Sequence, residues 1–555
     1  MNLLQSYGRK APNRIFVAVL LGIASGMGYA FLIPTVMAAL SPQDAMLATV
    51  APDLSHLFGI EIAHPSFAAT FFLVCVFVLG SRTLSRTMLI RLSMEVAAEL
   101  RMTLARRIAD AGCAELERIG PARLSSVLTE DVRRIVVGGQ LLPDLLINLI
   151  TLLGMFGFLL YLDAAAFRFV MGAIAFGVLT YQVPIWFARR VMLRSRASLD
   201  RVHEAVRGLI FGVKELKLDS RKAAFYFDRV LGLREQELLH NDRRAYTILV
   251  LGSSYGDMLS FFVIGVITFV FINYHAITVG DLSGVIMALL YVSGPVAFIM
   301  NVLPQLASAR ASLGNVERML GHVQAEEGAQ TASPDVVRPA WKRIRYTELA
   351  YRHRDKLGGE GFGIGPLDFE VERGEITFIV GGNGSGKSTL SKLVSLHYLP
   401  TEGRIEFDGC LVTDANRQAW RESVSIVFSD YYLFERLLRD VDAQTLMRAN
   451  AYLASLGLDQ KVQLTDGVFS TLALSDGQRK RLALMVALLD DKELYVFDEW
   501  AADQDPAFKD VFYRQLLPEL RARGKAVVVI SHDDRYFDVA DRLLAMETGS
   551  LRRLR

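Results

Sequence analysis

A run of glycines followed by lysine and serine has the spacing of a phosphate-binding loop. The segment Gly381-Gly-Asn-Gly-Ser-Gly-Lys-Ser-Thr389 fits the pattern Gly-x-x-x-x-Gly-Lys-Ser, which is informative when it joins a strand to a helix. The apolar run Ile376–Val380 predicts that strand, and the residues from Thr389 onward predict the helix. The sequence therefore predicts a site for a nucleoside triphosphate.

Each residue type in this loop has a chemical use. Glycines let backbone N–H groups turn toward an anion at a helix N-terminus. Lys387 can reach the β- and γ-phosphates, and Ser388 offers a hydroxyl to Mg²⁺. The residues predicted to contact the nucleotide here are Gly381, Gly382, Asn383, Gly384, Ser385, Gly386, Lys387, Ser388 and Thr389.

Two further apolar runs end in polar residues. Leu494–Phe497 leads into Asp498 and Glu499, and Ala526–Ile530 leads to His532. Because parallel strands deliver their following residues to one edge of a sheet, these side chains are expected near the phosphates. Asp498 is the second predicted Mg²⁺ ligand. Glu499 is predicted as the general base for the attacking water, and His532 as a catalytic contact to the γ-phosphate.

The composition divides the chain into two halves. Of 555 residues, 52% are apolar, more than is usual for a soluble protein. The apolar runs lie before about residue 310, and the remainder resembles a soluble α/β domain. A net charge of +2 gives no reason to expect a nucleic-acid partner. Cys75, Cys113 and Cys410 match no disulfide or metal spacing.

Six apolar segments are long enough to cross a lipid bilayer as helices. They cover residues 15–40, 66–90, 135–161, 164–188, 246–273 and 282–308. The first is open to a second interpretation as a cleaved signal peptide, because small residues occur near Ala38 and Ala39. Its apolar run is longer than a signal sequence needs, and more spans follow.

Lysine and arginine are confined to alternate connections between these spans. The connections 91–134 and 189–245 are rich in both residues. The connections without either are 41–65, 162–163 and 274–281. The positive-inside rule therefore predicts that the two basic connections and both termini are cytoplasmic. The basic connections favour helices, and short segments near 113–120 and 214–222 are predicted to touch the nucleotide-binding half.

Two aspartates, Asp144 and Asp257, lie inside predicted spans. An ionisable group at this depth usually faces a cavity or a partner side chain. A polar central cavity and a simple interhelical hydrogen bond are the two alternatives. Gly22, Gly26 and Gly28 are predicted to permit close packing of helices.

The predicted fold is a membrane bundle of six transmembrane α-helices followed by an α/β P-loop ATPase domain. The transmembrane domain, with its cytoplasmic extensions, is assigned to residues 1–320. A linker rich in Ala, Gly, Ser and Pro covers 321–340. The nucleotide-binding domain covers 341–555.

The segment Leu474-Ser-Asp-Gly-Gln478 resembles the signature sequence of ATP-binding-cassette (ABC) proteins. Together with the motifs above and the loop Asp503-Gln-Asp505, it completes the cassette in order over about 341–555, and six spans match the ABC exporter layout. The resemblance implies ATP and Mg²⁺ as cofactors, and two cassettes that enclose two ATP molecules. The chain has one cassette, so a homodimer or a pair with a related half-transporter is implied. The residues that the resemblance adds to the nucleotide site are Ser475, Gly477, Gln478 and Asp505.

A narrower resemblance comes from Asp498-Glu-Trp-Ala-Ala-Asp-Gln-Asp-Pro506 and Ser531-His-Asp-Asp-Arg-Tyr-Phe537. These runs are similar to the bacterial cyclic-peptide and siderophore exporters, including pyoverdine-type and microcin-exporting half-transporters. This likeness implies a bacterial inner-membrane protein that exports a cyclic or modified peptide. Peptide processing is not expected, because no protease-like domain precedes the first span.

Two positions depart from the general ABC pattern. Ser429 stands where a glutamine usually contacts Mg²⁺ and the attacking water, so a bridging water or Asp430 is expected to substitute. The aromatic residue that usually stacks on adenine corresponds to His353, with Tyr351 two residues away on the same face of a strand. Either ring is a candidate.

The sequence thus predicts an ATP hydrolase coupled to export, a translocase embedded in the bilayer. Within this class, the alternative is an exporter or flippase of lipids or hydrophobic drugs. Outside it, the alternative is a membrane protein that senses ATP without pumping, which predicts a degraded hydrolysis site.

Overall fold

The computed structural model describes residues 12–39, 55–57, 60–62, 65–323, 326, 340–354 and 360–555. The chain forms two compact units. The first unit combines Met1–Arg101 with Thr129–Glu317, and the second combines Met102–Leu128 with Arg318–Arg555. Most of the predicted linker, 321–340, lies outside the described residues.

Long helices make up the first unit. They are α2 (Pro12–Ala39), α3 (Pro65–Ala109), α6 (Val132–Leu162), α7 (Ala164–Phe211), α10 (Gly232–Phe269) and α11 (Val279–His322), with strands β1 (Ser55–Leu57) and β2 (Ile60–Ile62) between α2 and α3. The predicted spans 66–90, 135–161, 164–188 and 282–308 each fall within one of these helices, the span 15–40 matches α2 as far as Ala39, and the span 246–273 covers the end of α10 and the 3-10 segment 271–273. Among the described residues, five helical segments have the length and apolar composition to cross a membrane, and α7 contributes the shorter apolar segment Ala164–Thr180.

Glycines in α2 allow its neighbours to approach closely, as the sequence predicts. A Cβ atom on Gly26 would lie 2.9 Å from the carbonyl oxygen of Ile147 in α6. A Cβ on Gly28 would lie 2.5 Å from Cγ2 of Val78 in α3. Neither position has room for a larger residue, so small side chains set the spacing of these helices.

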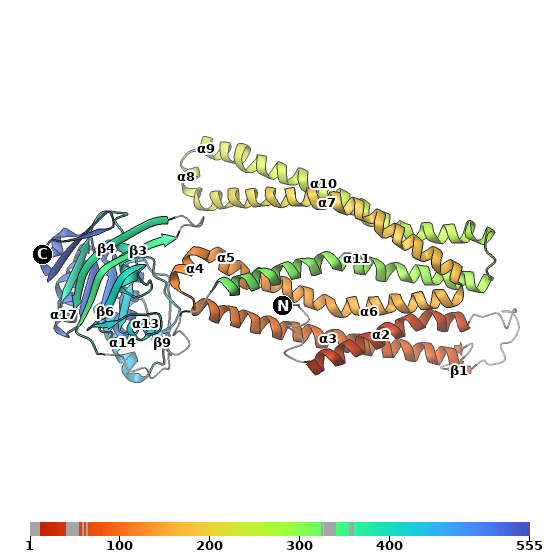
Figure 1. Cartoon of the computed structure of the whole chain (residues 1–555), viewed down its shortest axis with the longest axis horizontal. Helices are drawn as coiled ribbons and strands as arrows, with labels where there is room; N and C mark the ends of the chain where they lie inside the picture. The colour runs from red at the N-terminus through yellow and green to blue at the C-terminus, as the bar shows by residue number, and fades with distance from the viewer. Residues whose placement is uncertain are drawn as a thin grey trace. The chain divides into compact units, whose positions relative to one another are not determined.

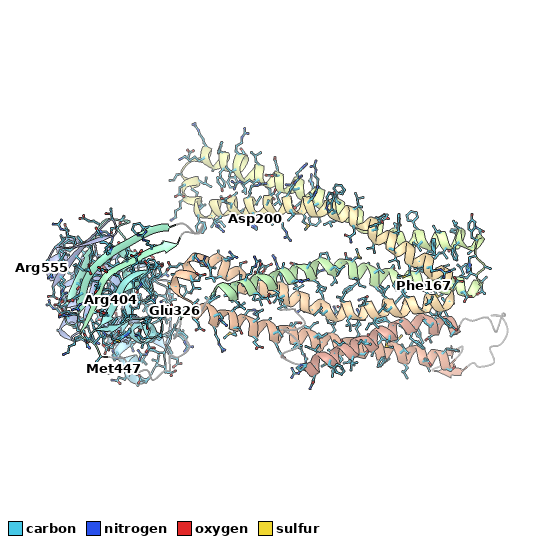
Figure 2. All side chains as sticks on the ribbon, viewed as in Figure 1. Phe167, Asp200, Glu326, Arg404, Met447 and Arg555 are labelled. Carbon is cyan, nitrogen blue, oxygen red and sulfur yellow. The ribbon has the colours of Figure 1, made fainter. Side chains whose placement is uncertain are left out.

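Helices α7 and α10 lie side by side along their length (Figure 1). Figure 2 shows side chains projecting outward along both helices. Several of these are large and apolar, including Phe176 and Phe187 of α7 and Phe261 and Phe262 of α10. An apolar surface of this kind suits contact with lipid or with a second chain.

Short helices join α7 to α10. They are α8 (Val213–Lys217), α9 (Ser220–Phe225) and the π-helix η2 (Tyr226–Leu231). They interrupt the predicted helical stretch where Gly212 ends α7 and Asp219 caps α9. This segment belongs to the first unit, and its predicted contact with the nucleotide-binding half stays a prediction.

The second unit is built around a six-stranded sheet with the order β14-β13-β5-β12-β11-β8. All of its neighbouring pairs are parallel except β13 with β14. Its strands are β5 (Ile376–Val380), β8 (Val424–Val427), β11 (Leu494–Asp498), β12 (Ala526–Ile530), β13 (Arg542–Glu547) and β14 (Ser550–Arg553). The P-loop therefore follows a strand next to the sheet centre, as predicted.

An antiparallel sheet of order β4-β3-β6-β7 completes the α/β architecture. Its strands are β3 (Arg343–Arg354), β4 (Glu360–Glu372), β6 (Glu402–Phe407) and β7 (Cys410–Leu411), and a separate hairpin pairs β9 (Leu464–Thr465) with β10 (Val468–Phe469). The helices are α4 (Cys113–Ile119), α5 (Pro121–Ser126), α12 (Lys387–Val394), α13 (Arg417–Arg421), α14 (Ala443–Ser455), α15 (Asp476–Leu489), α16 (Pro506–Val511) and α17 (Leu517–Ala522). The shorter 3-10 and π segments of this unit are η4 (Trp500–Asp503), η5 (Phe512–Leu516) and η6 (Asp534–Val539), whereas η1 (Val127–Asp131) crosses the sequence boundary between the units and η3 (Phe271–Asn273) belongs to the first unit.

The parallel sheet is buried on both faces, which explains its continuous apolar strands. Successive residues of β11 enter opposite cores, because side chains alternate along a strand. Tyr495 and Phe497 join one apolar cluster, and Leu494 and Val496 join the other. Rigid burial on both faces fixes where the strand-end residues emerge.

Candidate nucleotide-binding and hydrolysis site

The loop after β5 adopts a backbone conformation that favours glycine. Gly384 has a φ of 77° and Gly386 a φ of 106°. A Cβ on Gly386 would also lie 2.4 Å from Cγ2 of Ile364, so a larger residue would be both strained and obstructed. Gly386 is the N-cap of α12, so the loop leads directly into a helix N-terminus, where anions are favoured.

Lys387 lies inside this loop with 5% of its side chain exposed. Its Nζ donates to the carbonyl oxygens of Gly381 (3.0 Å) and Gly382 (2.9 Å). The buried hydroxyl of Ser385 has no hydrogen-bond partner among the described residues. A free buried hydroxyl beside an ammonium group and a helix N-terminus suits a phosphate group. The loop therefore fits the predicted nucleotide, and Asn383 and Ser388 are exposed where a ligand can reach them.

Asp498 ends β11 and is 2% exposed. The hydroxyl of Ser391 lies 3.1 Å from Asp498 Oδ2 and 3.0 Å from the carbonyl oxygen of Ser388. Burial raises the pKa of Asp498, and the negative charges of Glu499 and Asp430 act in the same direction. A divalent cation would favour the ionised carboxylate, so Asp498 and Ser388 fit the predicted Mg²⁺ site. Sequence reasoning missed Ser391, although it lies one helical turn after Ser388.

Glu499 and His532 meet because their strands are in parallel register. Asp498 pairs with Ile530, and the residues that follow emerge side by side. His532 Nε2 lies 3.0 Å from Glu499 Oε1, and Lys387 Nζ lies 3.8 Å from the same oxygen. Glu499 has a φ of 49°, a left-handed conformation that is uncommon outside glycine and clusters at functional sites. The two residues predicted to act in hydrolysis therefore lie together, whereas an ATP sensor would predict a degraded site.

A cavity of about 240 Å³ adjoins Glu499 and His532. Its wall includes Asp533, whose carboxylate accepts hydrogen bonds from Arg535 (2.7 Å) and Lys509 (3.1 Å). The hydrogen bond from Arg535 is the main cause that lowers the pKa of Asp533 to about 2. Asp533 is therefore ionised at neutral pH and ties the segment that follows His532 to Lys509 of α16. Arg535 lies in the same run of residues as His532, whereas Lys509 comes from α16, a contact that the run alone does not reveal.

Ser429 is exposed and lies two residues beyond the end of β8. Because β8 is parallel to β11, Ser429 emerges at the same edge as Asp498. The neighbouring Asp430 also lies close enough for its charge to raise the pKa of Asp498. Asp430 therefore has electrostatic reach to the predicted Mg²⁺ site, in line with the expectation that it substitutes for the usual glutamine.

Replacing Ser429 with glutamine is expected to leave kcat for ATP hydrolysis unchanged or raise it up to about threefold, because Asp430 or water already bridges to the site. Steady-state ATPase kinetics of the purified chain would measure this. Ser429→Ala is the matched control and should stay within about threefold of wild type. A fall of tenfold or more in both variants would mean that the serine hydroxyl itself is required.

Two aromatic candidates for the nucleotide base lie together on β3. The ring centroids of Tyr351 and His353 are 5.0 Å apart. Tyr351 stacks on Tyr398 with centroids 4.6 Å apart, which covers one face of its ring. His353 Nε2 lies 3.1 Å from Thr389 Oγ1, beside the P-loop. Burial, and then the charge of Lys392, lower the pKa of His353, so its ring is neutral at pH 7 and His353 is the better placed of the two.

Helix α4 contacts the same region of the cassette. Glu117 Oε1 accepts a hydrogen bond from Lys392 Nζ (2.8 Å), and Glu117 Oε2 accepts one from Tyr398 Oη (2.6 Å). Although burial opposes ionisation, these hydrogen bonds lower the pKa of Glu117. Lys392 belongs to α12, the helix that begins at the P-loop. The predicted contact of the segment near 113–120 with the nucleotide-binding half is therefore confirmed.

The signature residues form the first turn of α15. Ser475 Oγ accepts from the backbone N–H of Gln478 (3.4 Å), and Gln478 Oε1 accepts from the backbone N–H of Ser475 (3.2 Å). This reciprocal capping box fixes both side chains within their own chain. Gly477 lies beside Asp503, because an added Cβ would come within 3.0 Å of the Asp503 carbonyl oxygen. The result is an ordered helix N-terminus, which is a favourable position for an anion.

Polar contacts tie the loop 503–505 to α15. They join Lys480 Nζ to Asp503 Oδ2 (2.6 Å), Arg481 Nε to Gln504 Oε1 (2.9 Å), Arg481 Nη2 to Asp505 Oδ2, and Gln504 Nε2 to the Gly477 carbonyl oxygen (3.0 Å). The buried Trp500 also donates from Nε1 to the carbonyl oxygen of Lys480 (2.8 Å). Asp505, a predicted nucleotide contact, caps α16 through the N–H of Phe508 (2.9 Å). The loop after Glu499 and the signature helix are thus one connected piece.

These features define a P-loop ATPase of the ABC type joined to long apolar helices. Residues 364–502 match the family model for the ABC transporter. The chain is 32% identical over 471 residues to the ATP-binding protein SyrD of Pseudomonas syringae pv. syringae, and the match covers 83% of each chain. The chain belongs to the ABC transporter family.

Two other similarities span most of the chain. The ATP-dependent lipid A-core flippase of Ralstonia nicotianae is 26% identical over 529 residues, which is 89% of this chain and 82% of the relative. A solved bacterial Atm1-family ABC exporter with ATP bound has the same fold, with a TM-score of 0.70 and 17% identity over 98% of this chain and 95% of that one.

The family and the fold establish the general activity. The chain is an ABC half-exporter, a multi-pass inner-membrane protein whose ATP hydrolysis is coupled to transport. The predicted fold and the predicted class of enzyme are both confirmed.

Proposed function

We propose that this half-exporter works as a dimer, with a second copy of itself or a related half-transporter, and exports a cyclic or otherwise modified peptide. The cargo class rests on the resemblance of the run Asp498–Pro506 to the cyclic-peptide and siderophore exporters. The ATP-driven step rests on one observation above all. Lys387, Glu499 and His532 converge at one edge of the parallel sheet, beside a loop shaped for phosphates.

In the proposed mechanism the loop from Gly381 to Thr389 binds the phosphates, with Lys387 supplying positive charge. Ser388 and Asp498 would hold Mg²⁺, which would neutralise charge on the phosphate oxygens. Glu499 accepts the proton of the attacking water, and His532 contacts the γ-phosphate and keeps the Glu499 carboxylate in place. The residues proposed to contact the nucleotide bound by the other subunit are Ser475, Gly477, Gln478 and Asp505.

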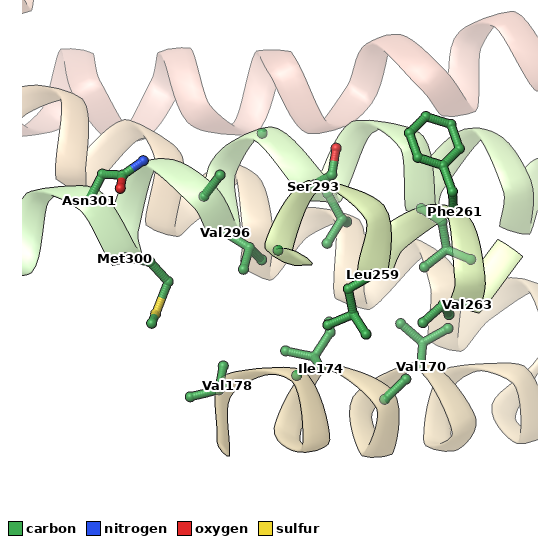
Figure 3. A pocket seen from close by; sticks show the side chains of 17 residues that line it. Val170, Ile174, Val178, Leu259, Phe261, Val263, Ser293, Val296, Met300 and Asn301 are labelled. Atoms are coloured by element: carbon green, nitrogen blue, oxygen red, sulfur yellow. The ribbon is translucent and has the colours of Figure 1, made fainter. Parts of the chain in front are cut away.

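An apolar cavity in the first unit supports a cargo with apolar groups. It has a volume of about 380 Å³ and is lined by α7, α10 and α11. Figure 3 shows mostly aliphatic side chains around it, among them Ile174, Leu259 and Val296, with the polar Ser293 and Asn301 on α11. A mainly apolar pocket with a few polar groups is the usual character of a small-molecule site.

The proposed membrane orientation puts both termini in the cytoplasm. Its support is the absence of Lys and Arg from connections such as 162–163 and 274–281, against their abundance in 189–245. With this orientation the cassettes have access to cytoplasmic ATP.

Stimulation of ATP hydrolysis by cargo tests the proposed function. Cyclic peptides and siderophore precursors are expected to raise the ATPase rate of the chain in lipid nanodiscs by about twofold or more, in a saturable manner, because cargo binding favours cassette closure. Linear peptides of the same composition serve as the matched control. A response to lipids or hydrophobic drugs with none to peptides would overturn the peptide assignment and favour the second candidate, which the similarity to the lipid A-core flippase supports.

A further inference from the structure

Two arginines and one aspartate lie together among the membrane helices. Arg82 and Arg86 are one helical turn apart on α3, and Asp144 lies on α6. Arg86 Nη2 is 3.1 Å from Asp144 Oδ2, and Arg82 Nη2 is 3.8 Å from Asp144 Oδ1. One carboxylate therefore faces two guanidinium groups, and the cluster carries a net charge of +1.

The described contacts use only part of the hydrogen-bonding capacity of this cluster. Arg82 Nη1 donates to Tyr29 Oη at 2.7 Å. Asp144 is 6% exposed, and its Oδ1 has no hydrogen-bond partner among the described residues. The side chains of Arg82 and Arg86 stay 39% and 51% exposed. Since a guanidinium group has five N–H donors, both arginines retain donors for a ligand.

Both arginines line a cavity of about 530 Å³ between α2 and α3. Its wall also carries the hydroxyl groups of Tyr29, Thr83 and Thr87, while Leu32 and Leu79 make part of it apolar. Positive charge and apolar wall thus occur in one cavity. A ligand that joins an anionic group to an apolar chain would use both.

The position of the cluster along α3 places it near one end of the membrane span. Arg82 lies 17 residues after Pro65, where α3 begins, which is about 26 Å along the helix. The hydrocarbon core of a bilayer is about 30 Å thick. The arginines therefore lie toward the end of the membrane-crossing part of α3, and the helix continues beyond them to Ala109. Near the end of a span, long basic side chains can reach the membrane interface, where the charged end of an amphiphile would also lie.

We infer that Arg82, Arg86 and Asp144 form a binding site for an oxyanion of the transported molecule, a carboxylate or a phosphate. The planar guanidinium fork matches either group with two parallel hydrogen bonds. Asp144 is the positioning residue, because it draws both guanidinium groups to one place and leaves the cluster with a net positive charge. This inference rests on the proposed export of cargo through the first unit and narrows the cargo to anionic amphiphiles.

Direct binding of a simple amphiphile tests the site. The probe is radiolabelled N-dodecanoylglycine, compared with its uncharged methyl ester, on the full chain in phosphatidylcholine nanodiscs with empty nanodiscs as background. The acid is expected to bind saturably and at least tenfold more tightly than the ester. Arg82→Gln combined with Arg86→Gln should reduce this preference to within about twofold. Arg91→Gln, an exposed arginine further along α3, is the matched control and should keep the preference.

Retained binding of the ester by the double variant would demonstrate that it is folded. Equal binding of acid and ester by the wild type, no saturable binding of either, or an acid preference that survives the double substitution would each overturn the inference. A second measurement uses nanodiscs that also contain phosphatidylglycerol. If this lipid prevents binding of the acid and the acid cannot displace it, the site binds a lipid headgroup and the inference that it binds cargo is wrong. Peptide-stimulated ATPase activity is a separate measurement, so failure of the oxyanion site and failure of the proposed function are distinguishable.

Discussion

Replacing Glu499 with glutamine is expected to lower the rate of ATP hydrolysis by at least a hundredfold while the Kd for ATP stays within about threefold of wild type. The amide keeps the size of the side chain but cannot accept the proton of the attacking water, and general-base catalysis contributes about 10²- to 10⁴-fold. Single-turnover hydrolysis and equilibrium binding of labelled ATP would separate the two quantities.

Glu519→Gln is the matched control, because Glu519 is an exposed carboxylate on α17. Its hydrolysis rate should equal that of the wild type. His532→Ala should also slow hydrolysis, since it removes the partner 3.0 Å from Glu499 Oε1. Near-normal turnover by Glu499→Gln would show that Glu499 is not the general base. The close approach of Lys387, Glu499 and His532 would then have no catalytic explanation.

Replacing Glu117 with alanine is expected to abolish the part of ATP hydrolysis that cargo stimulates, while unstimulated hydrolysis stays within about threefold of wild type. Glu117 joins α4 to Lys392 and Tyr398, and Lys392 lies on the helix that starts at the P-loop. Both partners are partly exposed or neutral, so the contacts contribute about 1–2 kcal/mol in total. ATPase assays of proteoliposomes with and without cargo would measure the loss.

The neighbouring Glu115 supplies a matched control on the same helix. Its carboxylate pairs with Arg118 of α4 itself, so Glu115→Ala removes an ion pair without disturbing the contact with the cassette. It should retain full stimulation. Equal losses in Glu115→Ala and Glu117→Ala would mean that α4 had unfolded rather than lost its partner.

The sequence predicted those parts of the site whose residues are close together in the chain. The P-loop requires a strand, a glycine-rich turn and a helix within a short stretch, and Asp498 and Glu499 directly follow a buried strand. Parallel strands then bring the ends of β5, β11 and β12 together without further information. The fold class followed from the same logic, because apolar segments of membrane-spanning length are unmistakable.

The parts that sequence could not predict depend on contacts between distant residues. No sequence pattern near Glu117 predicts that Lys392, 275 positions later, is its hydrogen-bond partner. The two alternatives for Asp144 stayed open for the same reason. The structure supports the interhelical alternative, because Asp144 forms ion pairs with arginines of another helix. The side chain of Asp257 lies outside those the structure describes.

The length of α7 has a mechanical consequence. As an unbroken helix of 48 residues, it measures about 72 Å, more than twice the thickness of the hydrocarbon it crosses. A rod of that length amplifies rotation, because a tilt of about 5° at one end displaces the other by about 6 Å. Its close pairing with α10 stiffens the rod against bending. A shift of the end of α7 that lies beyond the span, by one bond length along its axis, would move the far end by no more than that length. A change in the tilt angle of α7 would instead move side chains at the far membrane surface by more than the rise of one helical turn.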